Sequence, residues 1–352
     1  MKFCVPIISD AYRAWCDLVH FLRTRVGTVG SDHLKRFGSA VIPKQRPSHE
    51  ERRARVSDDM ITKGAARQQA PRAGSGIAEV AEFKMHWWLY AAGLVWGWFS
   101  LLEYLDAPVR AGLKSGMTPY SDAQWETPLV ATVGYIIFIA VGNRVMRDRK
   151  AMQATGLMFG YNVFQTTVNL WNVSALVYEA YRMFPAPWGN PIDTRMPQGH
   201  RMAFLIWAHY CNKYSELMDT VFMVLRKKTT QISFLHVYHH TLLIWSWWYV
   251  MRMGAGGDAY FGSGCNSFIH VVMYGYYAMA SLKIPCPWKK NITMMQMAQF
   301  AIVATNSLYV LYKGTMHWTV PALQLFVMTN MLVLFGRFFR KAYAKDSKKK
   351  AA

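Results

Sequence analysis

Residues 236–248 read His-Val-Tyr-His-His-Thr-Leu-Leu-Ile-Trp-Ser-Trp-Trp, so three histidines lead directly into an apolar and aromatic run. On a helix, positions 236, 239 and 240 follow i, i+3, i+4 spacing and present their rings from one face. The run that follows is too apolar for the active-site helix of a soluble enzyme. We therefore predict that His236, His239 and His240 face the interior of a helix bundle in a membrane.

Apolar segments of similar length recur along the rest of the chain. Each has about 18–25 mostly apolar residues, the length that crosses a ~30 Å hydrocarbon core. Only helices satisfy their own backbone groups in lipid at that length, so we predict an all-α, polytopic membrane helix bundle. The segments are residues 87–105, 125–142, 156–181, 202–225, 233–251, 264–283, 294–312 and 319–339.

The composition agrees with this class of protein. Of the 352 residues, 53% are apolar and 17% are charged, and the formal net charge is +20. Such a charge could indicate nucleic-acid binding, but the Lys and Arg residues fall in short clusters between apolar segments, which is typical of membrane topology. We therefore expect a lipid bilayer, and no nucleic acid, as a partner.

The first quarter of the chain differs from the remainder. Residues 1–86 carry 15 of the 40 Lys and Arg residues and contain no long apolar period, so we predict a basic, disordered N-terminal arm. An organellar transit peptide is the alternative, but acidic residues such as Glu50 and Asp58 interrupt its pattern. Residues 87–105 follow as an extra candidate span, and whether they cross the membrane decides on which side the arm lies.

The distribution of basic residues predicts the orientation. One set of alternate loops, together with the carboxyl terminus, holds 17 Lys and Arg residues, and the opposite set holds 7. Because basic loops stay in the cytosol, the first set and the C-terminus should be cytosolic. In the basic tail, residues 342–352, Lys349 and Lys350 match the dilysine signal for return to the endoplasmic reticulum, although any cytosolic terminus tends to be basic. We expect an endoplasmic-reticulum membrane protein.

The fourth apolar segment contains three charged residues, Lys213, Glu216 and Asp219. Each unpaired charge at mid-membrane costs roughly 2.5–3.5 kcal/mol, so these side chains need a polar interior. Their three-residue spacing predicts a Lys213–Glu216 pair, with Asp219 left to orient an imidazole. A buried ion network that only fixes helix packing is the alternative interpretation.

A second polar stripe follows on the sixth segment. Asn266 and His270 are four residues apart and share a helical face, which Tyr274 and Tyr277 continue. A lone histidine on such a helix is usually a hydrogen-bonded core residue. Because His270 is expected to face three other histidines, we consider it an active-site candidate.

Buried imidazoles can serve two chemistries. Histidine clusters bind iron in membrane desaturases, but such a site needs several histidine boxes and this chain has one, so we predict no metal. Imidazole also titrates near neutrality and can carry an acyl group, which favours acid–base or nucleophilic catalysis. An iron-dependent desaturase or hydroxylase and a transporter are more remote alternatives; for the transporter, no inverted repeat is visible.

Four motifs resemble those of the ELO family of fatty-acid elongases, in the same order. The resemblance covers residues 125–341 and implies a seven-span elongase core, outside which the arm and residues 87–105 lie. The motifs are K-x-x-E-x-x-D-T at 213–220, F-L-H-x-x-H-H at 234–240, N-x-x-x-H-x-x-M-Y-x-Y-Y at 266–277, and T-x-x-Q-x-x-Q at 293–299, which includes Gln296 and Gln299.

The resemblance implies a condensing enzyme of fatty-acid elongation. Such an enzyme joins a long-chain acyl-CoA to malonyl-CoA and gives a 3-oxoacyl-CoA two carbons longer, with CO2 and CoA; these thioesters are substrates, and no cofactor is bound. His239 would take the acyl group as an acyl-imidazole. His270 and Asn266 would stabilise an oxyanion or enolate, while His236 and His240 orient His239. Asp219 would fix the tautomer of one ring.

The resemblance also indicates a class of acyl chain. Gln231 and Val237 resemble the branch that acts on polyunsaturated chains. Residues 256–261, 286–290 and 326–335 resemble microalgal elongases of twenty-carbon, delta-5-desaturated chains. We expect eicosapentaenoyl-CoA as substrate, with an eighteen-carbon polyunsaturated chain as the alternative.

The remaining expectations concern binding and partners. Arg226, Lys227 and Lys228 directly precede the histidine box, where a CoA phosphate would arrive from the cytosol, although loop lysines also follow from topology alone. The reductases and dehydratase of the elongation cycle are expected partners, and a homodimer is compatible with the sequence. Side chains assigned to substrate binding are Lys213, Glu216, Gln231, Tyr274, Tyr277, Gln296 and Gln299, together with the three basic residues.

Overall fold

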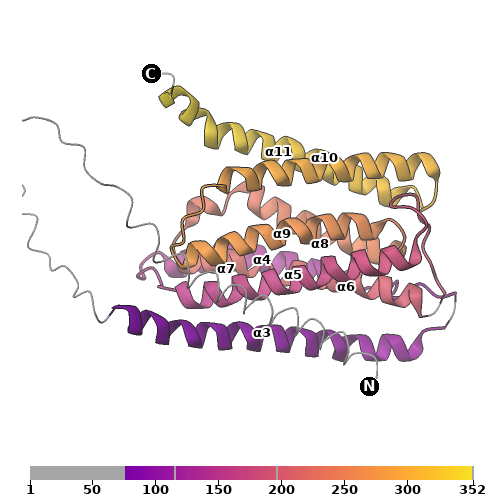
Figure 1. Ribbon diagram of the computed structural model, residues 1–352, viewed down its shortest axis with the longest axis horizontal. Coiled ribbons are helices and arrows are strands. Elements are labelled where there is room, and N and C mark those ends of the chain that lie inside the picture. Colours follow the sequence, from indigo (N-terminus) through magenta and orange to yellow (C-terminus); the bar gives the residue numbers. More distant parts are fainter. Residues whose placement is uncertain (1–75, 115, 196, 351–352) are drawn as a thin grey trace, which may run out of the picture. The chain divides into compact units, whose positions relative to one another are not determined.

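The computed structural model describes residues 76–114, 116–195 and 197–350, and within these ranges the chain is helical without any strand (Figure 1). The predicted all-α class is confirmed. Residues 1–75 of the predicted N-terminal arm lie outside the described residues, whereas its last part, residues 76–86, is helical and not disordered as predicted. The disorder of residues 1–75 therefore stays a prediction.

All eight predicted segments lie in helices. The last helix continues through Lys350, so the backbone of the predicted basic tail is helical over its described part. The elements are α3 (Gly76–Gly112), α4 (Glu126–Met146), α5 (Thr155–Met183), α6 (Gln198–Ser215), α7 (Met218–Leu225), the 3₁₀ turn η1 (Thr229–Gln231), α8 (Phe234–Gly254), α9 (Ala259–Ser281), α10 (Lys289–Lys313) and α11 (Thr319–Lys350).

The segment predicted as one helix over residues 202–225 is instead two helices, α6 and α7, with a break at Glu216 and Leu217. At the break, backbone N–H groups bond three residues back: Leu217 N to Tyr214 O at 3.2 Å and Asp219 N to Glu216 O at 3.1 Å. In such tighter winding, side chains three residues apart stay in line. Glu216 and Asp219 accordingly both face α9, where they meet His270 and Tyr274.

The helices expose apolar side chains and bury polar ones, the reverse of a soluble protein. On α5, Leu170 and Val177 are exposed, whereas Gln165, Asn169 and Asn172 are buried. The same holds for α10, where Ile302 is exposed and Asn306 is buried. Contiguous exposed apolar surface of this kind is typical of a protein embedded in lipid.

Two helices in the described part of the chain are long and apolar enough by composition alone to cross a membrane, α4 and residues 319–342 of α11. Composition is a weaker criterion for helices whose inner faces carry polar residues, such as α5. The bundle is therefore membrane-like in its surface as well as in these two helices.

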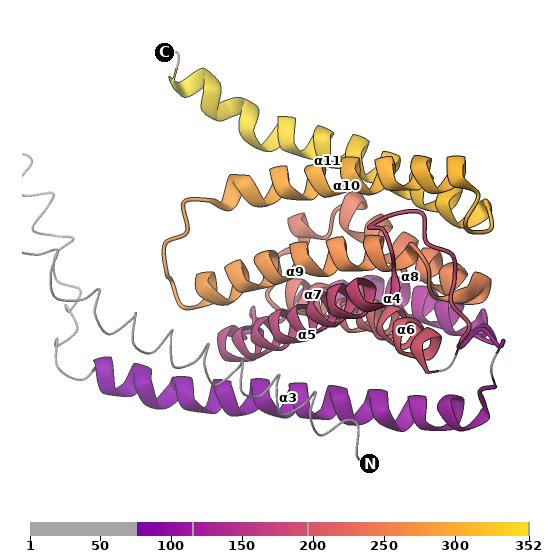
Figure 2. The ribbon, with the colours of Figure 1, turned by 45° about the vertical axis from the view of Figure 1, so that its right-hand side comes forward.

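Contacts between neighbouring helices close a ring in the order α5, α9, α10, α11, α8, α6 and back to α5. Figure 2 shows the α10–α11 pair on one side of this ring and α5 and α6 on the other. Helix α4 lies outside the ring, where it contacts α7 and α8. The ring encloses the polar residues that the helices bury.

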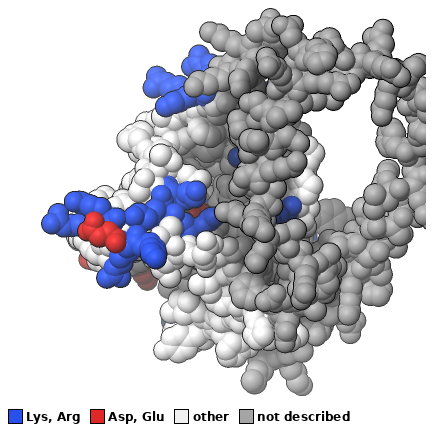
Figure 3. Space-filling model, turned by 90° about the vertical axis from the view of Figure 1, so that its left-hand side faces the viewer, with Lys and Arg blue, Asp and Glu red and all other residues white. Residues whose placement is uncertain are grey.

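Basic side chains gather at one end of the bundle (Figure 3). This is the end at which α11 finishes in Figure 1. Because consecutive helices alternate in direction, the loop after α4 and the loop before α8 lie at this end too. The histidine box, at the start of α8, is therefore close to the basic end.

Helix α3, which precedes the region of family resemblance, packs on the outer face of α5. Trp88 and Phe159 make an edge-to-face contact with ring centroids 5.0 Å apart, and Phe99 and Trp171 do the same at 4.9 Å. A Cβ atom added to Gly160 would lie 2.3 Å from the Tyr90 ring, so the glycine permits this close approach.

The other end of α3 is held by a buried carboxylate. Asp106, which is 1% exposed, lies 2.9 Å from His200 Nε2 and accepts a hydrogen bond from the Tyr120 hydroxyl. Arg110 Nη1 lies 3.4 Å from the second carboxylate oxygen of Asp106, so a cation is also close to this group. These contacts join α3 to the start of α6.

We expect Asp106→Ala to lower the thermal unfolding midpoint of the detergent-solubilised protein by about 4–8 °C, because it leaves His200 and Tyr120 without their buried acceptor. Fluorescence-detected size-exclusion chromatography after heating measures the midpoint.

The control is Asp122→Ala, which removes an exposed carboxylate from the loop that follows α3. It should leave the midpoint within about 1 °C of the unmodified protein. Equal midpoints for the two variants would contradict the role given to Asp106.

Candidate active site

The histidine box occupies the first two turns of α8. Ser233 caps this helix: its side-chain oxygen accepts a hydrogen bond from His236 N at 3.3 Å, and its own backbone is extended. Since the helix begins at Phe234, the three imidazoles lie at its N-terminal end. The cap therefore sets where the box begins.

The three imidazoles contact one another as the spacing predicted. His236 and His240, one turn apart, have ring centroids 4.6 Å apart, and His239 and His240 have centroids 5.3 Å apart. His240 is buried, and His239 borders the internal cavity described below. Of the three, His239 is thus the one placed to meet a ligand in that cavity.

Glu216 lies at the centre of a buried polar cluster. Its Oε1 accepts a hydrogen bond from Lys213 Nζ at 2.6 Å and lies 3.0 Å from His270 Nδ1. Lys213 Nζ also donates to Asn266 Oδ1 at 2.7 Å. The predicted Lys213–Glu216 pair is present, and the same carboxylate reaches the imidazole of the second stripe.

This cluster leaves particular atoms free for a ligand. Because the ammonium of Lys213 can only donate, it fixes Asn266 Oδ1 as its acceptor and leaves the Nδ2 donors of Asn266 available. His270 turns Nδ1 toward Glu216, which leaves Nε2 on the other side of the ring. Asn266 also lines the cavity that His239 borders.

Asp219 differs from its expected place. We predicted that it would orient an imidazole, but its Oδ2 accepts a hydrogen bond from the Tyr274 hydroxyl at 2.7 Å. The carboxylate beside an imidazole is Glu216 instead. Asp219, one turn beyond Glu216, meets Tyr274, which is one turn beyond His270 on α9.

The predicted tyrosine stripe also divides. Tyr274 is fully buried, whereas Tyr277 is 40% exposed and packs its ring against Tyr274, at 6.0 Å between centroids, and against Tyr276, at 5.6 Å. Tyr277 therefore lies at the edge of the cluster.

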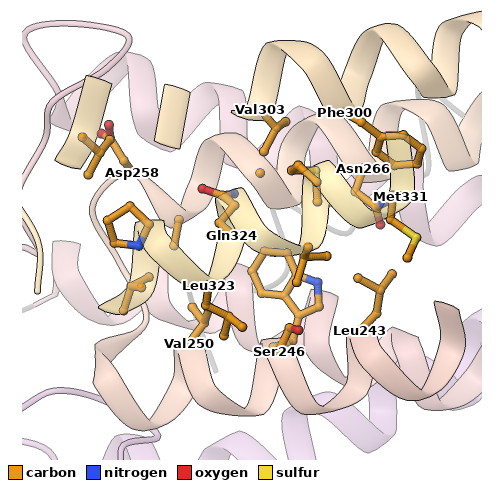
Figure 4. Close-up of a pocket in the computed structure, with 18 of the residues that line it drawn as sticks. Leu243, Ser246, Val250, Asp258, Asn266, Phe300, Val303, Leu323, Gln324 and Met331 are labelled. Atoms are coloured by element: carbon orange, nitrogen blue, oxygen red, sulfur yellow. The ribbon is translucent and has the colours of Figure 1, made fainter. Parts of the chain in front are cut away.

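The internal cavity lies between α8, α9, α10 and α11 (Figure 4). Figure 4 shows Asn266 toward one end and Asp258 at the other, with Gln324 between them. His239, near the start of α8, and Gln299 also border the cavity. The remainder of its wall is mostly apolar. Apolar lining residues include Leu243, Trp247, Val250, Phe300, Val303, Leu323, Val327, Met328 and Met331.

The far end of the cavity is built around Asp258. Its carboxylate accepts hydrogen bonds from the backbone N–H groups of Gly189 at 2.6 Å and Asn190 at 2.8 Å, in the loop between α5 and α6. Gly257, with φ +48°, brings the turn before α9 so close that a Cβ would lie 2.7 Å from Asn190 O. The loop and the turn together cover this end.

The glutamines of the fourth motif have different surroundings. Gln299 is buried and borders the cavity. Gln296 points to Met273, whose sulfur is 3.8 Å from its Nε2. Only Gln299 is therefore placed to meet a ligand in the cavity.

The basic residues before the box lie outside the cluster. Lys227 Nζ donates to Arg147 O at 2.8 Å and to Arg149 O at 3.1 Å, so it holds the end of α4. Arg226 is directed to the sulfur of Met158, and Lys228 and Gln231 are exposed. Lys228 is the basic residue of this loop most open to an incoming phosphate.

Several polar residues of the site were not predicted. Thr220 lies 2.7 Å from His236 Nε2, and Tyr135 OH lies 2.8 Å from the Thr220 hydroxyl. Gln165 accepts from Asn212, which extends the cluster onto α5. The i, i+4, i+7 spacing of Gln165, Asn169 and Asn172 in an apolar segment is a signal that could have identified the inner face of α5.

In the described residues, no group of three or more His, Cys, Asp or Glu side chains is arranged to hold a metal ion. The absence of a bound metal stays a prediction. The chemistry available at this site is that of imidazole, amide and carboxylate groups.

Comparison of the sequence with known proteins identifies the family of this chain. Residues 120–351 match the family described as ELO: GNS1/SUR4 family. The chain is similar to very long chain fatty acid elongase 7 of Rattus norvegicus, with 31% identity over 61% of this chain and 79% of the relative. It is also similar to very long chain fatty acid elongase 4 of Homo sapiens, with 32% identity over 66% of this chain and 76% of the relative.

A third relative is very long chain fatty acid elongase 2 of Rattus norvegicus, with 33% identity over 62% of this chain and 80% of the relative. The family match covers more than half of the chain and includes every motif that carries the resemblance. The chain therefore belongs to the ELO family and is a membrane-embedded condensing enzyme of fatty-acid elongation, an acyltransferase of the 3-oxoacyl-CoA synthase type.

Proposed function

We propose that this enzyme extends a polyunsaturated acyl-CoA by two carbons from malonyl-CoA and carries the acyl group on His239. The observation that supports this best is the position of His239 and Asn266 together at one end of a largely apolar cavity. An acyl chain would occupy the cavity, and its thioester would lie at the histidines. The reductases and dehydratase of the elongation cycle would then consume the 3-oxoacyl-CoA product.

In the first step, an imidazole nitrogen of His239 attacks the thioester carbonyl. The C–S bond breaks, CoA leaves as the thiol after taking up a proton, and an acyl-imidazole remains. The Nδ2 donors of Asn266, which lines the same cavity as His239 and bonds to Lys213 through Oδ1, would stabilise the oxyanion that develops.

In the second step, malonyl-CoA loses CO2, and the carbanion equivalent attacks the acyl carbon. The new C–C bond forms as the C–N bond to His239 breaks, and the departing ring nitrogen takes up one proton from water, which regenerates the neutral imidazole. His270, held by Glu216 through Nδ1, stabilises the enolate with Nε2. Lys213 and Glu216 act here by holding Asn266 and His270, since their charged atoms are directed to those side chains.

We expect His239→Ala to lower the condensation rate at least about 100-fold, because it removes the atom that carries the acyl group. Release of CO2 from radiolabelled malonyl-CoA by purified enzyme measures this step. As a control, His317→Ala removes an exposed histidine bonded to Thr319 and should leave the rate unchanged. Near-normal condensation by the His239 variant would refute the nucleophile assignment.

The length of the cavity limits the length of the acyl chain that it can hold. On α8 the lining runs from His239 to Val250, eleven residues, or ~16 Å at the helical rise. Cis double bonds fold an acyl chain and shorten its reach, so a polyunsaturated chain suits a cavity of limited length. We propose a twenty-carbon chain, eicosapentaenoyl-CoA, as the substrate, with an eighteen-carbon polyunsaturated chain as the alternative.

Yeast cells that express the enzyme and are fed eicosapentaenoic acid should accumulate its two-carbon elongation product, as measured by gas chromatography of fatty-acid methyl esters. Val303→Phe should lower this conversion at least about fivefold, because the larger ring fills the cavity. Stearidonic acid, fed in parallel, tests the eighteen-carbon alternative.

The matched control is Ile302→Phe, one residue along α10. Ile302 is 49% exposed on the outside of the bundle, whereas Val303 is 1% exposed. Conversion by the control should equal that of the unmodified enzyme. Equal losses in the two variants would contradict the cavity as the acyl site, and no elongation of either fatty acid would contradict the polyunsaturated assignment.

We further propose that the enzyme lies in the endoplasmic-reticulum membrane with its C-terminus and basic end in the cytosol, and that α3 is an eighth span. From Trp87, beside the start of α5, to Asp106, beside the start of α6, α3 covers nineteen residues, or ~28 Å. This length matches a ~30 Å hydrocarbon core.

With α3 as a span, epitopes attached to the two ends of the chain should both react with antibody after selective permeabilisation of the plasma membrane. Neither Asn172, which is buried, nor Asn291, on the proposed cytosolic side, should carry a glycan. An N-terminal epitope detected only after the internal membranes are opened would remove the eighth span. A glycan on Asn291 would reverse the orientation.

A further inference from the structure

Tyr135 belongs to none of the four motifs, yet it contacts the histidine box from outside the helix ring. It lies on α4 and is 5% exposed. Its hydroxyl is 2.8 Å from Thr220 Oγ1, which in turn is 2.7 Å from His236 Nε2. A chain of two hydrogen bonds thus links α4 to the first histidine of the box.

The ring of Tyr135 has a second contact in the box. It meets the imidazole of His240 edge to face, with centroids 6.3 Å apart. His240 in turn contacts both His236 and His239. One tyrosine therefore touches His240 directly and reaches His236 through Thr220, while His239 packs against His240.

The hydrogen-bond chain can define one tautomer of His236. The Thr220 hydroxyl has a single proton and is fully buried. When it donates that proton to His236 Nε2, its oxygen accepts from the Tyr135 hydroxyl, and the proton of His236 must lie on Nδ1. Both hydroxyl donors then have an acceptor, whereas in the reverse arrangement the buried Tyr135 hydroxyl proton has none among the hydrogen bonds of the structure.

We propose that Tyr135 is a positioning residue that fixes the tautomer of His236 and the packing of His240, and thereby the orientation of His239. The proposal rests on the function proposed for His239. Tyr135 acts on the chemical step through these neighbours and does not contact the substrate.

The same pair of helices offers a matched control. Thr132, one turn before Tyr135 on α4, accepts a hydrogen bond from Trp245 Nε1 of α8 at 3.0 Å. This bond also joins α4 to α8, but it involves no histidine. Removing it tests helix packing alone.

The experiment compares Tyr135→Phe and Thr132→Val in the purified, full-length enzyme. Tyr135→Phe should lower kcat for condensation about three- to tenfold, the loss expected for one buried hydrogen bond, and leave KM for acyl-CoA within about twofold. Thr132→Val should leave both constants within about twofold of the unmodified enzyme. An unchanged kcat for Tyr135→Phe, or an equal fall in the two variants, would overturn the proposal.

A double-mutant cycle adds a readout that packing would not move. Because Tyr135 acts on His236 through Thr220, the Tyr135→Phe change should have little further effect on kcat in a Thr220→Val background. Additive losses would show that the tyrosine does not act through this chain and would overturn the tautomer role.

The His239→Ala variant separates this proposal from the function on which it rests. If His239→Ala is inactive and Tyr135→Phe is normal, only the role of Tyr135 fails. If His239→Ala keeps near-normal activity, the histidine mechanism fails and the positioning role fails with it.

Discussion

The polar interior of this bundle depends on the contacts that the carboxylate of Glu216 makes. This carboxylate is buried, and it joins an ammonium, Lys213, to an imidazole, His270, from a different helix. Removing one member would leave an uncompensated charge away from water, which costs far more than an ordinary contact. Lys213 also donates to Oδ1 of Asn266, a residue that lines the cavity. Stability of the polar interior and orientation of the reacting groups therefore have one physical origin.

Helix positions could be predicted from the sequence because lipid imposes a length on every span. The break between α6 and α7 could not, since hydropathy does not register a change from i−4 to i−3 bonding around Glu216. Spacing alone also could not tell which carboxylate meets the imidazole: Glu216 lies beside His270, whereas Asp219 meets Tyr274. Contacts between residues of one helix can be predicted from their spacing in the sequence, whereas contacts between helices depend on how the helices pack.

The site itself was predictable where motifs mark it and unpredictable where single residues contribute. His239, Asn266 and Gln299 share a cavity wall, as a common site requires. Tyr135 and Thr220 gave no separate signal, because one tyrosine in an apolar segment is ordinary. Lys227 shows the reverse case. Its place in a basic run suggested a phosphate ligand, but its ammonium instead donates to the carbonyl groups of Arg147 and Arg149, directly after α4.

Helix α3 contacts the bundle through the outer face of α5 and the start of α6, and no described residue of α3 lines the cavity. Binding of the acyl chain and attachment of this helix therefore use separate side chains. Evolution can alter one without the other: heat tolerance or membrane placement can be tuned at Gly160 and Asp106 while the choice of fatty acid is left untouched. In the described part of the chain, α3 is therefore a support on the outside of the bundle, separate from the cavity wall.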